Sequence, residues 1–285
     1  MVGTGSPTVR RRELGALLRK LRTDRNLTID DVARQTEFSP SKISRMETGH
    51  RGAIARDIRD LCDLYGVEDE ERQHLIELAS EGKQRAWWLP LRLPYSDYVG
   101  LEAEAVTISD YGLGGMPGLL QTPDYARAIL QAAVPRWVPE IVEQRVRGRI
   151  ARQQILSGPN APQFHAVIDE SVLHRVVGSP VVMYAQLTKL LDICEFSNVS
   201  LRVIPFEAGA LPSGNNKFII LAFGSQTIAD VVFVEGLTGD LYLDDPEEVE
   251  VYNLTFRSLR ELAGTAEQTR AMIASMISAY EAQIG

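Results

Sequence analysis

The sequence predicts an N-terminal all-α domain of five helices containing a helix-turn-helix, followed by a C-terminal mixed α/β (α+β) domain. Three observations lead to this fold class. Apolar residues in the first 82 positions recur at helical spacing, the composition changes at Gly82, and beyond it short β-branched or aromatic runs alternate with helical segments. A chain of 285 residues is long enough for two ordinary domains. We therefore expect domains over 1–82 and 99–285, joined by a linker over 83–98.

The first helix is predicted from its leucines. Leu14, Leu17, Leu18 and Leu21 follow the i, i+3, i+4, i+7 pattern of a helix face that covers a core, and the segment ends near Asn26.

The second helix begins after Thr28, a residue type that caps helix N-termini. The acidic residues 30–31 in the first turn interact favourably with the helix dipole. The helical pattern ends at about Thr36.

A three-residue turn, 37–39, separates it from the third helix. Ser39 is expected to cap that helix, with Pro40 at its first position and Gly49 just beyond its end. The last two helices of the domain are expected at Ile54–Tyr65 and Glu68–Glu81.

The second domain shows strand and helix signals in alternation. Strands are expected at Phe164–Asp169, Val199–Pro205, Lys217–Phe223 and Ala229–Glu235. Helices are expected at Pro123–Val134, Pro139–Leu156, Val181–Phe196, Pro246–Leu262 and Ala266–Ala282.

Two short helices joined by a tight turn, with polar residues on the outer side of the second, are typical of a helix-turn-helix that reads DNA. Ile43 and Met46 are expected to face the core. The outer residues can then reach base edges or phosphates in the major groove. The alternative is a five-helix bundle with a solvated charged face.

The segment LGALLRKLRTDRNLTIDDVARQTEFSPSKISRMETG resembles the DNA-binding domains of the Cro/C1 type, also called the xenobiotic-response-element type, over about residues 14–64. The resemblance implies that Ser41 and Arg45 are the main base readers. It also implies a structural ion pair between Arg22 and Glu47. The full set of expected DNA-contacting residues is Thr28, Ser39, Pro40, Ser41, Lys42, Ser44, Arg45, His50 and Arg51.

Within this set Thr28, Lys42 and Ser44 are expected to contact mostly phosphate. The sequence departs from the family at two positions. Glu37 stands where glycine is common, so a left-handed backbone there would cost about 1 kcal/mol. Pro40 stands where such readers often carry Gln, so base reading is not expected from that side chain.

The charge is unevenly distributed along the chain. Residues 1–60 hold 13 basic and 8 acidic residues, a net charge of +5, and the remainder holds 17 and 30, a net charge of −13. A basic head on an acidic chain favours double-stranded DNA as a partner of the head. Two cysteines and no long apolar run indicate a cytoplasmic protein with no disulfide framework and no membrane partner.

Catalytic motifs are scarce in the second domain. The four histidines show no metal-ligand spacing and no nucleophile elbow occurs, so we expect no metal, no cofactor and no enzyme activity. His174 and Glu170 could form an acid–base pair or, alternatively, an ordinary pair on a helix surface. The glycine-rich stretch 112–118 lacks the lysine of a phosphate loop and is better explained as a tight turn.

The best candidate for an effector loop is GLLQT, with the residues that follow it. Its polar members are Gln121, Thr122, Tyr125 and Arg127. The alternative is simply a helix start that is capped by Thr122.

A second resemblance covers about residues 87–262. The blocks MPGLLQTPDYARAIL, VIDESVLHRVVGSPVVMYAQLTKLL and VSLRVIPFEAGALPSGNNKF resemble, in the same order, the C-terminal domain of actinobacterial regulators of the WhiJ type. This implies a transcription regulator, often accompanied by a small companion protein encoded nearby.

The function expected from the sequence is a sequence-specific transcriptional regulator, a homodimer whose second domain dimerises or senses a small-molecule effector or partner. The alternative is an antitoxin-like interaction protein that binds a small companion protein and represses its own operon. An enzyme carrying a DNA-targeting domain is a third reading, which the missing catalytic motifs disfavour.

Overall fold

A computed structural model describes residues 6–84, 86–91, 95–133, 138–214, 216–225, 227–236 and 238–284. The chain divides into two units, Met1–Glu104 with Gly224–Ala229, and Ala105–Phe223 with Asp230–Gly285. The domain and linker bounds expected from the sequence stay a prediction.

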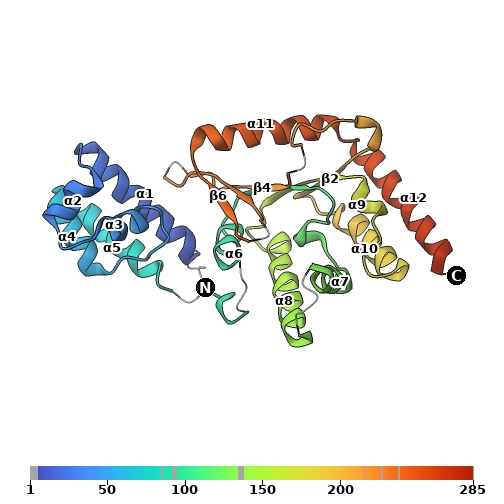
Figure 1. The fold of residues 1–285 in the computed structure, drawn as a ribbon, viewed down its shortest axis with the longest axis horizontal. Helices are drawn as coiled ribbons and strands as arrows, with labels where there is room; N and C mark the ends of the chain where they lie inside the picture. Colours follow the sequence, from blue (N-terminus) through green and yellow to red (C-terminus); the bar gives the residue numbers. More distant parts are fainter. Residues whose placement is uncertain are drawn as a thin grey trace. The chain divides into compact units, whose positions relative to one another are not determined.

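The first unit is helical, and each of its five predicted helices is present (Figure 1). They are α1 (Pro7–Asp24), α2 (Ile29–Gln35), α3 (Pro40–Glu47), α4 (Ala55–Tyr65) and α5 (Asp69–Glu81). The sequence analysis did not predict two later elements of this unit, the 3-10 turn η1 (Leu89–Leu91) and α6 (Ser96–Glu102).

The leucine face of α1 lies in the core of this unit. Leu14 and Leu18 are buried, and between them Gly15 lets α1 approach the C-terminal end of α3. A Cβ atom on Gly15 would lie 2.6 Å from the carbonyl oxygens of both Met46 and Glu47. The close approach of the two helices therefore depends on the absence of a side chain at this position.

The second unit contains a mixed six-stranded sheet in the order β3-β2-β1-β4-β5-β6. The strands are β1 (Thr107–Gly112), β2 (Gln163–Asp169), β3 (Val199–Ile204), β4 (Phe218–Ala222), β5 (Val231–Val234) and β6 (Leu241–Leu243). Strands β1, β2 and β3 run parallel to one another. The other pairs are antiparallel: β4 with β1, β5 with β4 and β6 with β5.

Helices cover both faces of this sheet. The elements are α7 (Pro123–Ala133), α8 (Pro139–Arg152), α9 (Ser171–His174), α10 (Pro180–Ile193), α11 (Pro246–Leu262) and α12 (Ala266–Ile284), with 3-10 turns η2 (Gly118–Leu120), η3 (Gln153–Ser157) and η4 (Phe206–Ala208). Figure 1 shows α11 along one face and α7, α8 and α10 on the other. The predicted fold class, an all-α helix-turn-helix unit plus an α+β unit, is confirmed. None of the described helices is both long and apolar enough to cross a bilayer.

The central strand β1 is one of two strands that the sequence analysis missed, the other being the short β6. In β1 Ile108 pairs with Phe164 on one side and with Leu221 on the other, and all three are buried. The signal was weak because Asp110, only 6% exposed, interrupts the apolar pattern. The turn expected over 112–118 does follow, but it starts directly from this strand.

The outer strand β3 is bonded to the junction of α11 and α12. The backbone N–H of Val203 donates to Thr269 Oγ1 at 3.1 Å, and the Gly264 N–H donates to the Val203 carbonyl at 2.9 Å. Thr269 is fully buried by this contact.

Candidate nucleic-acid interface

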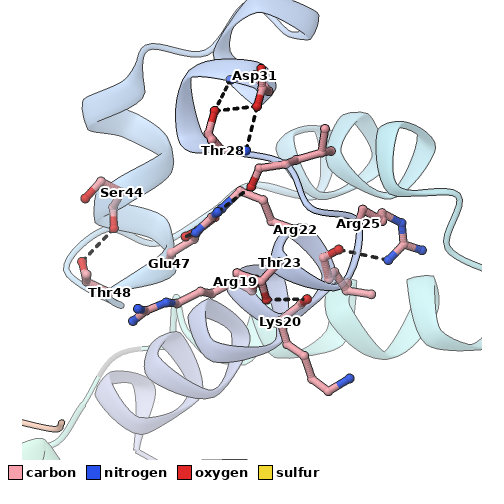
Figure 2. A network of polar contacts seen from close by, with 12 residues as sticks. Arg19, Lys20, Arg22, Thr23, Arg25, Thr28, Asp31, Ser44, Glu47 and Thr48 are labelled. Carbon is pink, nitrogen blue, oxygen red and sulfur yellow. Dashed lines mark hydrogen bonds and ion pairs between the residues drawn. The ribbon is translucent and has the colours of Figure 1, made fainter.

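The helix pair α2–α3 starts on two side-chain caps. Thr28 Oγ1 accepts a hydrogen bond from the Asp31 N–H at 3.1 Å, and the Asp31 carboxylate accepts one from the Thr28 N–H at 2.9 Å, which together form a capping box (Figure 2). Ser39 Oγ accepts from the Lys42 N–H at 3.2 Å and caps α3. Both caps agree with the sequence analysis.

The turn between the two helices needs no left-handed residue at Glu37. Among the described non-glycine residues, the backbone φ is positive at Asn26 alone, just after α1, where Asn is well tolerated. The strain considered for Glu37 is therefore absent. This chain closes the turn with an ordinary backbone.

A buried ion pair fixes α3 against α1. Arg22 Nε and Nη2 donate to the two carboxylate oxygens of Glu47 at 2.7 and 2.9 Å, and Arg22 Nη1 donates to the Leu27 carbonyl at 2.7 Å (Figure 2). The side chains are 12% and 5% exposed. The hydrogen bonds to Glu47 raise the pKa of Arg22, so its guanidinium stays charged. This is the ion pair that the Cro/C1 resemblance implies.

The outer face of α3 carries the residues expected to read bases. Ile43 and Met46 are buried, whereas Ser41 and Arg45 are exposed and Ser44 is half-buried. Arg45 Nε donates to the Ser41 carbonyl at 3.2 Å, and no ion-pair partner of Arg45 lies within the described parts of the chain. Its guanidinium therefore keeps most of its donors available for a base edge.

Two expected phosphate contacts are engaged inside the protein. Lys42 Nζ lies 2.8 Å from Asp57 Oδ1 and 3.6 Å from the centroid of the Phe38 ring, so it is held against its own domain. The hydroxyl of Thr28 donates to Asp31 Oδ2 at 2.6 Å, which uses its hydrogen. Each of the two side chains thus has a carboxylate partner within the protein, and contact of either with phosphate stays a prediction.

Beyond α3, the loop to α4 exposes His50 and Arg51. The Arg51 N–H donates to the Arg45 carbonyl at 2.9 Å, and His50 Nδ1 lies 2.9 Å from Thr48 Oγ1. Pro40 and Ser39 are exposed at the start of α3. These four residues therefore border the exposed face of α3.

Arg56 is an exposed basic residue that the sequence analysis did not name as a candidate for DNA contact. This residue lies in the first turn of α4, is 77% exposed and sits 3.9 Å from Asp60. Its neighbour Asp57 pairs with Lys42, which brings the start of α4 beside the start of α3. The signal in the sequence was a basic residue in the first turn of the helix that follows the helix-turn-helix.

Two families match the chain. Residues 13–75 match a helix-turn-helix domain, and residues 95–275 match a domain of unknown function, DUF5753. The second match covers more than half of the sequence. The chain belongs to the DUF5753 family. Its helix-turn-helix domain makes it a DNA-binding regulator. Comparison with curated proteins and with solved structures gives no match.

In the DUF5753 domain, the candidate effector loop lies between β1 and α7. Gln121 and Tyr125 are buried, and Thr122 Oγ1 accepts from the Tyr125 N–H at 3.3 Å. Arg127 forms ion pairs with Asp124 and with Glu143, whose Oε2 lies 3.1 Å from Nη2. The alternative of a helix start capped by Thr122 matches this arrangement, and a role in sensing stays a prediction.

The described part of the DUF5753 domain and of the helical unit holds no group of three His, Cys, Asp or Glu side chains that could bind a metal ion. His174 Nε2 lies 3.2 Å from Glu170 Oε1, while the other oxygen of Glu170 accepts from the Phe206 N–H at 2.8 Å. Glu170 therefore also holds the backbone of the segment that follows β3.

Proposed function

We propose that this DUF5753 protein is a sequence-specific transcriptional regulator of the Cro/C1 type that binds its operator as a homodimer. The observation that carries the proposal is the exposed face of α3, on which Ser41 and Arg45 are presented while the buried Arg22–Glu47 pair holds the helix in place. Rigid presentation of a few polar side chains is what base reading in the major groove requires.

In this proposal Arg45 is the main base reader and Ser41 assists it. Ser39, His50, Arg51 and Arg56 surround them and contact phosphates. Arginine forms bidentate hydrogen bonds with guanine, and the neighbouring cations supply the sequence-independent part of the affinity.

The homodimer follows from the size of the reader. One helix-turn-helix covers half a site, and a two-fold operator needs two copies about one helical turn of DNA apart. In this proposal the DUF5753 domain supplies the dimer contact or responds to an effector.

We also propose that the chain acts by binding rather than by catalysis. Two observations support this. Glu170 accepts a hydrogen bond from the backbone N–H of Phe206, and burial raises the pKa of the Cys62 and Cys194 thiols. A protonated thiol is a poor nucleophile.

Fluorescence anisotropy with a duplex selected by the full chain from a random pool, and with a scrambled duplex, tests the proposal. Arg45→Ala should weaken binding to the selected duplex by about 1–3 kcal/mol and change binding to the scrambled one little. Arg257→Ala, which removes an exposed arginine of α11, is the matched control. Equal loss on both duplexes would remove Arg45 from base reading.

A further inference from the structure

The segment between β1 and α7 is held by long polar side chains from α8, η3 and α10. Gln121, which is 4% exposed, is their common partner. Its side-chain oxygen accepts from Arg149 Nη1 at 2.8 Å. Its main-chain carbonyl accepts from Gln153 Nε2 and from Lys189 Nζ, each at 2.7 Å.

Two of these side chains are cations that have no carboxylate partner among the described residues. Lys189 Nζ donates to the Gln121 carbonyl and to Gln153 Oε1 at 2.6 Å, and Arg149 donates to the Gln121 amide oxygen. Over the described ranges, neither has a carboxylate within 4.0 Å. Burial lowers the pKa of Lys189, as expected for an ammonium group that loses water and gains no anion.

The cluster also has unused donors. Lys189 has three N–H groups and Arg149 has five, and the bonds above use only part of them. Arg149 Nε is buried and has no acceptor among the described atoms. An unsatisfied buried donor of this kind commonly marks the position of a water molecule or an ion.

Gly118, a half-buried residue of this loop, has space beside it for one carbon atom. A Cβ atom built on Gly118 would meet a single heavy atom within 4 Å, Arg152 Nη2 at 3.9 Å. Arg152 is itself buried at the end of α8 and has interactions of its own within the protein, so the site does not depend on its charge.

From this juxtaposition we propose that Arg149, Lys189 and the Gly118–Gln121 segment form a binding site for a small molecule that carries a carboxylate or phosphate group. The oxyanion would supply the counter-charge that no described residue provides. The inference deepens the proposed sensing role of the DUF5753 domain, because the same side chains hold the chain segment that joins β1 to α7. Occupation would therefore stiffen that connection.

Thermal unfolding of the full chain without DNA tests the site, with phosphate and succinate as probes. The probes are used at about 10 mM, with ionic strength held by potassium chloride, because general salting effects are small there. The wild type should gain about 2–4 °C with at least one probe. Lys189→Met should lose the gain. It should also be at least as stable as the wild type without probe, because it removes an unpaired, half-buried charge.

Lys217→Met is the matched control, since Lys217 is an exposed lysine of the same unit that pairs with Glu235. It should respond to the probes as the wild type does. No shift with either probe, or equal shifts in all three proteins, would overturn the site. Because no DNA is present, failure here is separate from failure of the DNA-binding proposal, which anisotropy measures.

Discussion

Among single residues, Glu47 and Arg22 carry the contact that connects the reader helix α3 to α1. Both carboxylate oxygens of Glu47 accept hydrogen bonds from one guanidinium, and both side chains are almost fully buried. Removing one partner of such a pair leaves the other charge buried and unpaired, which costs far more than the pair itself contributes.

Glu47→Gln should therefore lower the free energy of unfolding by about 3 kcal/mol. Urea denaturation of the full chain, followed by circular dichroism, measures this. Asp24→Asn is the matched control, because its pair with Lys20 is exposed and should be worth less than about 1 kcal/mol. Similar losses in the two variants would show that burial of the Arg22–Glu47 pair is unimportant.

Lys42 makes a second prediction at this scale. Its ammonium group is paired with Asp57, whose side chain is 10% exposed. Lys42→Met should cost about 1–3 kcal/mol of stability, since it leaves that carboxylate without a partner. The added change Asp57→Asn should recover part of the loss.

The same variant decides the role of Lys42 in DNA binding. If the lysine stays with Asp57, the salt dependence of DNA affinity is unchanged in Lys42→Met. A phosphate contact would instead lower the slope by about 1.

Residue types at helix ends could be predicted from the sequence, because capping is local: Thr28 and Ser39 act within three residues of themselves. The partner of Lys42 could not. Asp57 is fifteen positions away on α4, and only the packing of α4 beside α3 brings the two charges together.

At the scale of helices and strands, the contact between α1 and α3 depends on Gly15. Alanine is the better helix former by about 1 kcal/mol. A Cβ there would nevertheless lie 2.6 Å from two backbone oxygens of α3, which cannot move without moving the reader helix.

Gly15→Ala should therefore destabilise the chain by about 1–2 kcal/mol and weaken DNA binding, because overpacking outweighs helix propensity. Thermal unfolding and anisotropy measure the two effects. At Gly52 a Cβ would meet only Arg11 Cδ at an ordinary 3.6 Å, so Gly52→Ala is the stability control. A Gly15→Ala protein more stable than the wild type would contradict the packing argument.

The helices α1 to α5 were predictable because each buries one face at regular spacing. The sheet was less so. Strand β1 holds the central place, between β2 and β4, yet its sequence TISDYG shows no apolar run. Its position is set by neighbours that are distant in the sequence, and only the pairing partners reveal it.

For the whole molecule, the separation of charge between a basic head and an acidic remainder is the dominant property. Since phosphate contacts release counterions from DNA, affinity for the selected duplex should fall about a thousandfold between 50 and 200 mM salt. Anisotropy across a salt series measures the slope. Affinity that is independent of salt would mean that the basic head does not lie on the phosphate backbone.

The charge separation and the reader's role could be inferred from composition and from one short segment. The candidate anion site could not, because Gln121, Arg149 and Lys189 meet only after β1, α8 and α10 are in place.

The contacts of Val203 bear on how the protein behaves at high concentration. A free outer strand offers unpaired N–H and C=O groups on which another chain can add a strand, a common start of aggregation. On β3 the outward N–H and carbonyl of Val203 are already taken by Thr269 and Gly264. Shortening the chain before α12 would uncover this position, so C-terminal truncations should precipitate where the full chain stays in solution.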